Sequence, residues 1–119
     1  MGAKLMAIMR ICIDATVNDE RGVHARPSAL IVKACRNYPG AVTVSRADEP
    51  DGPEYDCKGI MGLIEMDAAC KTRLRFCVDP PAALGRVALD EEERRAKALC
   101  DRLAEIVSMT LEEIERLLQ

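Results

Sequence analysis

The sequence has little histidine, no Cys-x-x-Cys pair and no long apolar run, and each shortage excludes a class of protein. Its 119 residues include one histidine, so a cysteine–histidine zinc motif cannot be assembled. No apolar run approaches membrane-spanning length, and no charged start followed by an apolar core and a cleavage site marks a secretory leader. We therefore expect no metal, no membrane insertion and a cytoplasmic location.

An excess of basic residues is also missing. The 17 Lys and Arg residues are outnumbered by 20 Asp and Glu residues, and the net charge is −3. This balance argues against a nucleic-acid-binding protein, whose surface carries a basic face. The basic residues nearest the single histidine, His24, are Arg21, Arg26, Lys33 and Arg36. A local basic patch on an acidic chain suits an acidic partner surface.

Six cysteines are present, and their spacing supports neither a disulfide framework nor a metal site. We expect most of them to be small apolar side chains in the core, which is the usual place of a free cysteine. Hydrophobic residues make up 49% of the chain and charged residues 31%, which is typical of one folded domain. No internal repeat is visible.

Hydrophobic periodicity predicts four strands and four helices. Residues 9–16 and 72–78 alternate as strands with one buried face, and residues 41–45 and 55–58 are shorter strands. Helices are expected at residues 25–38 and 59–66, and a longer one is expected to begin with Asp90 as its cap and to end near Val107. Thr110 and Glu113 have capping-box spacing, which predicts a further short helix at residues 111–118. Residues 46–54 form a polar loop.

His24 lies in the stretch Gly22–Ser28, immediately before the first predicted helix. Pro27 falls in the first helical turn, where proline is tolerated because the N–H groups there have no intrahelical acceptor. His24 is thus at or near the N-cap, where a phosphate on its ring would meet the unpaired N–H groups of Ala25 and Arg26 and the positive end of the helix dipole. The guanidinium of Arg26 adds donors for phosphate oxygens. A surface or capping histidine without chemistry is the alternative.

The run Gly-Val-His-Ala-Arg-Pro-Ser at residues 22–28 closely resembles the active-site segment of HPr, the histidine-containing phosphocarrier of the bacterial sugar phosphotransferase system. A second segment, Cys-Lys-Gly-Ile-Met-Gly-Leu at residues 57–63, is similar to that family's Lys-Ser-Ile-Met-Gly segment. The resemblance implies an α+β domain over residues 9–107, with the order βαββαβα. Its four-stranded antiparallel sheet would be covered on one face by helices, with the last strand between the first two. Residues 1–8 and 108–119 would be an N-terminal extension and a helical tail.

The resemblance also implies a function. Enzyme I, charged from phosphoenolpyruvate, would phosphorylate Nδ1 of His24, and His24 would pass the phosphoryl group to enzyme IIA. Such a carrier is a monomer without a cofactor. Two other functions stay open: a regulatory binding module whose phosphorylation state selects its partner, and a thiol enzyme, which nothing in the spacing of the cysteines supports.

The resemblance places an apolar docking patch beside the histidine, formed here by Val32, Met61 and Ile64. Lys33 and Arg36 are placed to steer an acidic partner. The alternatives are that the apolar residues are core and the basic ones ordinary solvated charges. We expect Ile60 to be core.

One position departs from the family. Gly59 stands where Gram-positive members carry a regulatory serine, and glycine has no hydroxyl to phosphorylate. The resemblance therefore does not extend to serine phosphorylation.

Overall fold

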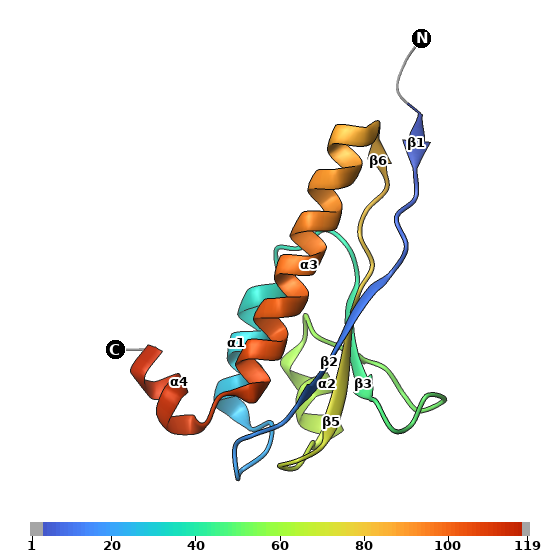
Figure 1. The fold of residues 1–119 in the computed structure, drawn as a ribbon. Helices are drawn as coiled ribbons and strands as arrows, with labels where there is room; N and C mark the ends of the chain where they lie inside the picture. Colours follow the sequence, from blue (N-terminus) through green and yellow to red (C-terminus); the bar gives the residue numbers. More distant parts are fainter. Residues whose placement is uncertain (1–3, 118–119) are drawn as a thin grey trace.

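The computed structural model describes residues 4–117, and Figure 1 shows the arrangement of its elements. The first three residues of the predicted extension and the last two of the predicted tail lie outside the described residues. The elements in chain order are β1 (Leu5–Met6), β2 (Ile11–Thr16), α1 (Ala25–Cys35), β3 (Val42–Arg46), β4 (Tyr55–Asp56), α2 (Ile60–Met66), β5 (Arg73–Val78), β6 (Ala83–Leu84), α3 (Arg86–Ser108) and α4 (Leu111–Leu117).

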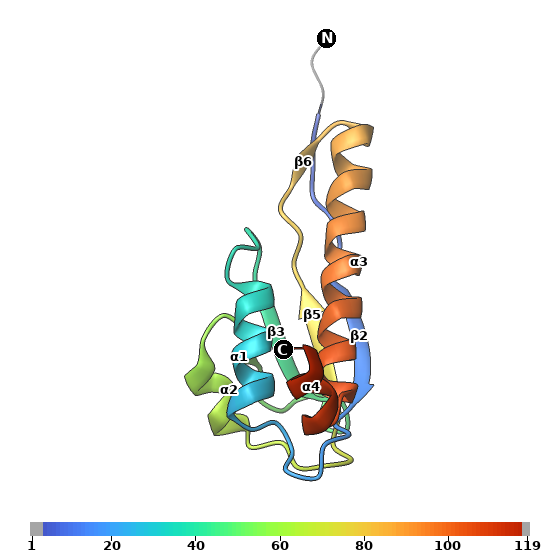
Figure 2. The ribbon, with the colours of Figure 1, turned by 90° about the vertical axis from the view of Figure 1, so that its left-hand side faces the viewer.

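The main sheet has four antiparallel strands in the order β2-β5-β3-β4. Strand β5 thus lies between β2 and β3, as the resemblance implied, and the predicted α+β class is confirmed. Helices α1, α2 and α3 lie on one side of this sheet (Figure 2). A single apolar face on each helix suffices for such a two-layer arrangement.

The core forms where the buried face of β5 meets the helices. Leu74, Phe76 and Val78 are fully buried, as their alternation predicted. Phe76, the only phenylalanine of the chain, lies opposite Ile13 of β2 and Val44 of β3. Burying a side chain of this size stabilises the fold by about 1.5–3 kcal/mol, so the central strand anchors the layer on which α1 is held.

Helix α3 begins earlier than predicted. Asp90 was expected to cap it, but the helix starts at Arg86 and Asp90 lies inside it. The N-cap is Gly85, which has φ of 85°, and the Leu89 N–H donates to its carbonyl at 3.0 Å. Glycine is the residue that adopts a positive φ without steric cost. Just before this cap, β6 pairs with β1 in a two-stranded ribbon that periodicity did not reveal.

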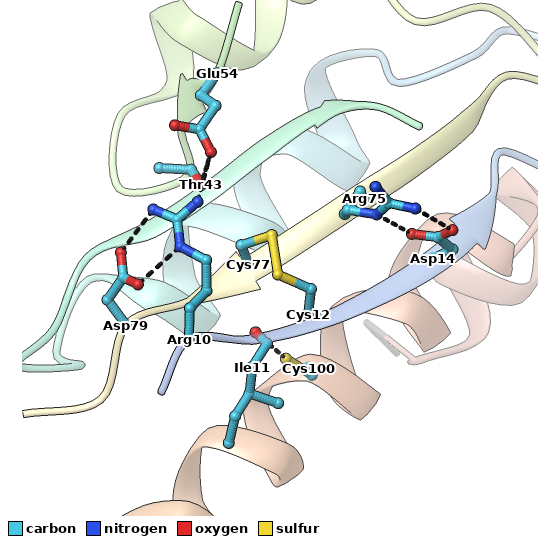
Figure 3. Close-up of a disulfide and its surroundings, with 10 residues drawn as sticks. All are labelled: Arg10, Ile11, Cys12, Asp14, Thr43, Glu54, Arg75, Cys77, Asp79 and Cys100. Atoms are coloured by element: carbon cyan, nitrogen blue, oxygen red, sulfur yellow. Dashed lines mark hydrogen bonds and ion pairs between the residues drawn. A yellow bond between two sulfur atoms is a disulfide. The ribbon is translucent and has the colours of Figure 1, made fainter. Parts of the chain in front are cut away.

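The prediction for the cysteines is wrong at two positions. Cys12 of β2 and Cys77 of β5 are directly opposite each other, with Cα atoms 4.1 Å apart, and form a disulfide (Figure 3). The pair is 65 residues apart in sequence, so only the register of the two strands brings it together. Cys35, Cys57 and Cys100 are buried free thiols, as expected, and Cys70 is a half-buried free thiol.

Ion pairs flank the disulfide on the sheet (Figure 3). The guanidinium of Arg10 donates to Asp79 and to Glu54, each at 2.8 Å, and so joins three separate segments. On the other side, Arg75 Nε donates to Asp14 at 2.7 Å. These hydrogen bonds hold the pKa values of the Asp79 and Asp14 carboxyl groups below their ordinary range.

The extra C-terminal helix is confirmed, and its predicted cap is present. The Glu113 N–H donates to Thr110 Oγ1 at 3.3 Å, while the Thr110 N–H donates to the Glu113 carboxylate at 3.2 Å. This reciprocal pair is a capping box. Ile114 is fully buried and anchors α4 on the body of the protein. Helix α4 contacts α1, which brings the tail to the predicted site.

Candidate functional site

The turn before α1 holds the backbone of His24 in place. Gly22 has φ of 75°, and a Cβ there would lie 2.3 Å from the carbonyl oxygen of Ala68, so no larger residue fits. The Val23 N–H donates to that same carbonyl at 2.8 Å, and the His24 N–H donates to Gly22 at 3.1 Å. The approach to the helix is therefore tied to the segment after α2.

His24 is the N-cap residue of α1, as the sequence predicted. Its backbone is extended, with φ of −97° and ψ of −167°, and its carbonyl accepts the Ser28 N–H at 3.1 Å. Its side chain makes no capping hydrogen bond. The first-turn N–H groups of Ala25 and Arg26 are therefore free of side-chain caps from His24, and the positive end of the helix is available to an anion.

The two ring nitrogens of His24 have different surroundings. The side chain is 24% exposed, and Nε2 is buried without a hydrogen-bond partner. Nδ1 is not among the buried unpaired atoms of residues 4–117, and no hydrogen bond engages it there. Nδ1 is thus the less enclosed of the two ring nitrogens.

Asp19 is a site residue that the sequence analysis missed. Its side chain is almost fully buried, and Oδ1 lies 3.8 Å from His24 Nε2. Oδ1 accepts the Arg21 N–H at 2.8 Å, and Oδ2 accepts the N–H of Leu111, the first residue of α4. Burial alone would raise the pKa of this carboxyl group, but the two N–H donors and the charge of Arg21 lower it overall. In turns, an aspartate carboxylate commonly accepts the N–H of the residue two positions ahead. This local pattern was the signal in the sequence that could have identified Asp19.

Arg26 is engaged rather than free. Its Nη1 donates to Glu115 of α4, and the two side chains are 52% and 48% exposed. Glu115 would therefore compete with a phosphate on His24 for the Arg26 guanidinium. The helical tail therefore reaches two residues of the site, Asp19 and Arg26.

The predicted docking residues lie on α1 and α2, which contact each other. Met61 is 64% and Ile64 48% exposed, while Leu63 and Met66 fill the core from the opposite side of α2. Ile60 was expected to be core, but it is 39% exposed and extends the apolar surface beside Met61. Helix α2 has only seven residues, so a single buried stripe accommodates two of its large side chains and leaves the others outside. Lys33 of α1 and Arg36, the C-cap residue of that helix, are exposed, and Val32 of α1 packs partly against the core.

Lys58 and Gly59 link the two helices. Lys58 Nζ donates to the carbonyl of Tyr38, just beyond the end of α1, at 2.6 Å. Gly59 is the N-cap of α2, with an extended backbone, and a Cβ at this position would meet no atom within 4 Å. A serine would therefore fit at position 59 without strain.

The buried thiols do not form a second site. The interaction between the Cys35 and Cys57 thiols raises the pKa of Cys57, to which burial adds, and lowers the pKa of Cys35. Both side chains are fully buried, so neither thiol is open to a substrate at the surface. Within residues 4–117, no group of three or more His, Cys, Asp or Glu side chains is arranged to hold a metal ion. None of the helices in this range has the length and apolar character needed to cross a bilayer.

Comparison with known proteins identifies the family of the chain. Residues 11–108 match the family model described as the PTS HPr component phosphorylation site. The phosphocarrier protein HPr of Treponema pallidum is 37% identical over 65 residues, which are 55% of this chain and 69% of that protein. The multiphosphoryl transfer protein of Haemophilus influenzae is 33% identical over 60 residues, half of this chain but 12% of that longer protein.

Solved structures support the fold. The histidine-containing phosphocarrier protein of Mycoplasma superposes with a TM-score of 0.61 at 18% identity, and the match covers 83% of this chain and 98% of that one. Phosphocarrier protein HPr of Bacillus anthracis gives a TM-score of 0.56 at 20% identity, with 80% and 98% of the two chains covered.

Proposed function

Because this chain belongs to the HPr family of phosphocarriers in the phosphotransferase system, we propose that enzyme I phosphorylates His24 and that His24 passes the phosphoryl group to enzyme IIA. In this proposal residues 9–107 are the carrier domain, flanked by an extension at 1–8 and a helical tail at 108–119. The protein acts as a cytoplasmic monomer, and no cofactor takes part.

The observation that carries the proposal is the position of His24 at the N-cap of an 11-residue helix, with Nδ1 the less enclosed of its two ring nitrogens. A neutral imidazole is a competent nucleophile near pH 7. The N–P bond forms at Nδ1 as the bond between phosphorus and the donor breaks. The phosphoryl oxygens then face the N–H groups of Ala25 and Arg26, which are already oriented and need no reorganisation.

Exposed apolar side chains beside α1 support transfer between proteins. Met61 and Ile64 are three residues apart and therefore lie on the same side of α2. Methionine adapts its shape to different surfaces, which suits a carrier that meets both a donor and an acceptor. Lys33 of α1 and Arg36 at its C-cap add positive charge that accelerates the encounter with an acidic partner.

The test is discharge as well as charging. The protein is incubated with phosphoenolpyruvate and enzyme I, and the phosphorylated form is then mixed with purified enzyme IIA while intact mass is followed. We expect gain of one phosphoryl group and its loss to enzyme IIA. Charging without discharge to any enzyme IIA would contradict the carrier proposal and favour a regulatory module.

Met61→Ala tests the docking surface in the same assay. We expect KM for the partner to rise about fivefold, equivalent to about 1 kcal/mol, because one interface contact is lost. Val87→Ala is the matched control, because Val87 is also exposed, at 85%. It lies at the start of α3, at the far end of the molecule from α2 (Figure 1). Equal KM values for the two variants would remove Met61 from the docking surface.

A further inference from the structure

The buried ring nitrogen of His24 faces a buried carboxylate. Nε2 has no hydrogen-bond partner, and Oδ1 of Asp19 lies 3.8 Å away. An unpaired buried polar atom is costly, so its orientation toward a fixed negative charge calls for an explanation. The explanation below rests on the proposed function of His24.

The carboxylate of Asp19 is rigidly held. It is 4% exposed, Oδ1 accepts the Arg21 N–H at 2.8 Å, and Oδ2 accepts the Leu111 N–H. The guanidinium of Arg21 lies 3.7 Å from Oδ1 and helps to keep the group charged. The Arg21 N–H and the Arg21 guanidinium both act at Oδ1, so they keep this oxygen beside the ring.

We propose that Asp19 is a positioning residue for phosphoryl transfer, which keeps the proton of the neutral His24 ring on Nε2. A neutral imidazole carries one N–H, and the partner at one nitrogen selects which nitrogen bears it. An N–H directed at a carboxylate is attracted to it, whereas a lone pair in the same place is repelled. With the proton on Nε2, Nδ1 keeps the lone pair that attacks phosphorus.

The same contact acts after transfer. When the N–P bond forms at Nδ1 and the donor departs with its bonding electron pair, the ring has a phosphorylated Nδ1 and a protonated Nε2 and so gains positive charge. Asp19 faces that charge at Nε2 and stabilises it in a partly buried site. On discharge the N–P bond breaks, its electrons return to Nδ1, and Nε2 keeps its proton throughout.

A purely structural role for Asp19 makes a different prediction. Its bond to the Leu111 N–H fastens α4, so loss of Asp19 could act on the tail alone. Leu111→Pro separates the two roles. It removes that N–H, and proline fits the first position of a helix. The Asp19 charge and the bond from the Arg21 N–H to Oδ1, the oxygen that faces His24, remain.

The first measurement needs no variant. His24 is the only histidine among the 119 residues, so the ¹⁵N shifts of its two ring nitrogens are unambiguous in the NMR spectrum of this chain, recorded at a pH at which the ring is neutral. We expect a protonated Nε2 and an unprotonated Nδ1. A ring with its proton mainly on Nδ1 overturns the proposal even if no variant folds. This NMR measurement needs no phosphorylation, so it tests the position of the ring proton even if the wild type accepts no phosphoryl group.

The variants follow with the same spectrum and with quench-flow measurement of phosphoryl acceptance from phosphorylated enzyme I. Asp19→Asn is expected to raise the fraction of ring protonated on Nδ1 and to slow acceptance about tenfold, since it removes a unit charge about 4 Å from the ring. Leu111→Pro is expected to leave the ring shifts and the rate as in the wild type. Unchanged ring ¹⁵N shifts in Asp19→Asn would overturn the proposal. An equal change of the shifts and the rate in Leu111→Pro would also overturn it.

Discussion

The ion pair between Arg26 and Glu115 is the point where the C-terminal helix meets the proposed phosphate site, and Glu115→Gln removes it while keeping the side-chain shape. Both side chains are about half exposed, and an exposed pair of this kind contributes about 0.2–1 kcal/mol. Helix α4 has two further attachments, the buried Ile114 and the bond from Leu111 to Asp19. We therefore expect the variant to fold normally and to lose less than about 1 kcal/mol of stability.

The Arg26–Glu115 ion pair stabilises the folded protein but is expected to slow phosphoryl acceptance. In the proposed transfer Arg26 leaves Glu115 for the phosphoryl oxygens. The free energy of the ion pair is then lost and adds to the activation barrier for phosphoryl acceptance. A value of about 0.2–1 kcal/mol corresponds to a factor of about 1.4 to 5 in rate. Glu115→Gln should therefore accept phosphate faster by up to about fivefold, and the gain should shrink as salt screens the pair in the wild type.

The assay is quench-flow at low ionic strength with phosphorylated enzyme I in excess. Glu112→Gln is the matched control: it changes the net charge equally and lies on the same helix, and among residues 4–117 Glu112 forms no ion pair. We expect the control to match the wild type. Equal rates for the two variants, or a slower Glu115→Gln, would show that Arg26 does not exchange Glu115 for phosphate, and the reasoning would be refuted.

Two further predictions concern the disulfide and the N-cap of α2. For the 65-residue separation of Cys12 and Cys77, the chain-entropy relation gives about 4 kcal/mol. In urea unfolding, the double variant Cys12→Ser/Cys77→Ser should lose about this much free energy of unfolding under oxidising conditions and much less in reductant. The control Cys70→Ser should leave the free energy of unfolding unchanged under both conditions. Wild-type unfolding curves that do not respond to reductant would disprove the bond. ATP and an HPr kinase should leave the wild type unmodified, whereas Gly59→Ser should accept phosphate at position 59, where the space is open. Tandem mass spectrometry would map any phosphate. Phosphate on a serine of the wild type would contradict this prediction.

Patterns that depend on near neighbours were predicted well. The alternation of Leu74, Phe76 and Val78 predicted the central strand, and the capping-box spacing of Thr110 and Glu113 predicted the start of α4. In each case the residues that determine the element lie within a few positions of one another. The strand order was predicted by resemblance, because chain order alone permits several sheets.

Features that depend on register or docking could not be predicted. Cys12 and Cys77 meet only because β2 and β5 pair in one register. Asp19 reaches His24 and α4 together only because the tail folds back onto the turn before α1. Helix α3 begins after Gly85, whose φ is positive, and not at Asp90. In the sequence Gly85 is only one glycine in a segment that contains proline and alanine, and nothing there marks it as a helix cap.

Phosphoryl acceptance by His24→Ala tests the central claim most directly. The ring of His24 is partly exposed and makes no capping bond, so we expect the variant to keep the circular dichroism spectrum of the wild type. After incubation with phosphoenolpyruvate and enzyme I, intact mass spectrometry should show one acid-labile phosphoryl group on the wild type and none on His24→Ala. A folded His24→Ala protein that still gains a phosphoryl group from enzyme I would contradict the account.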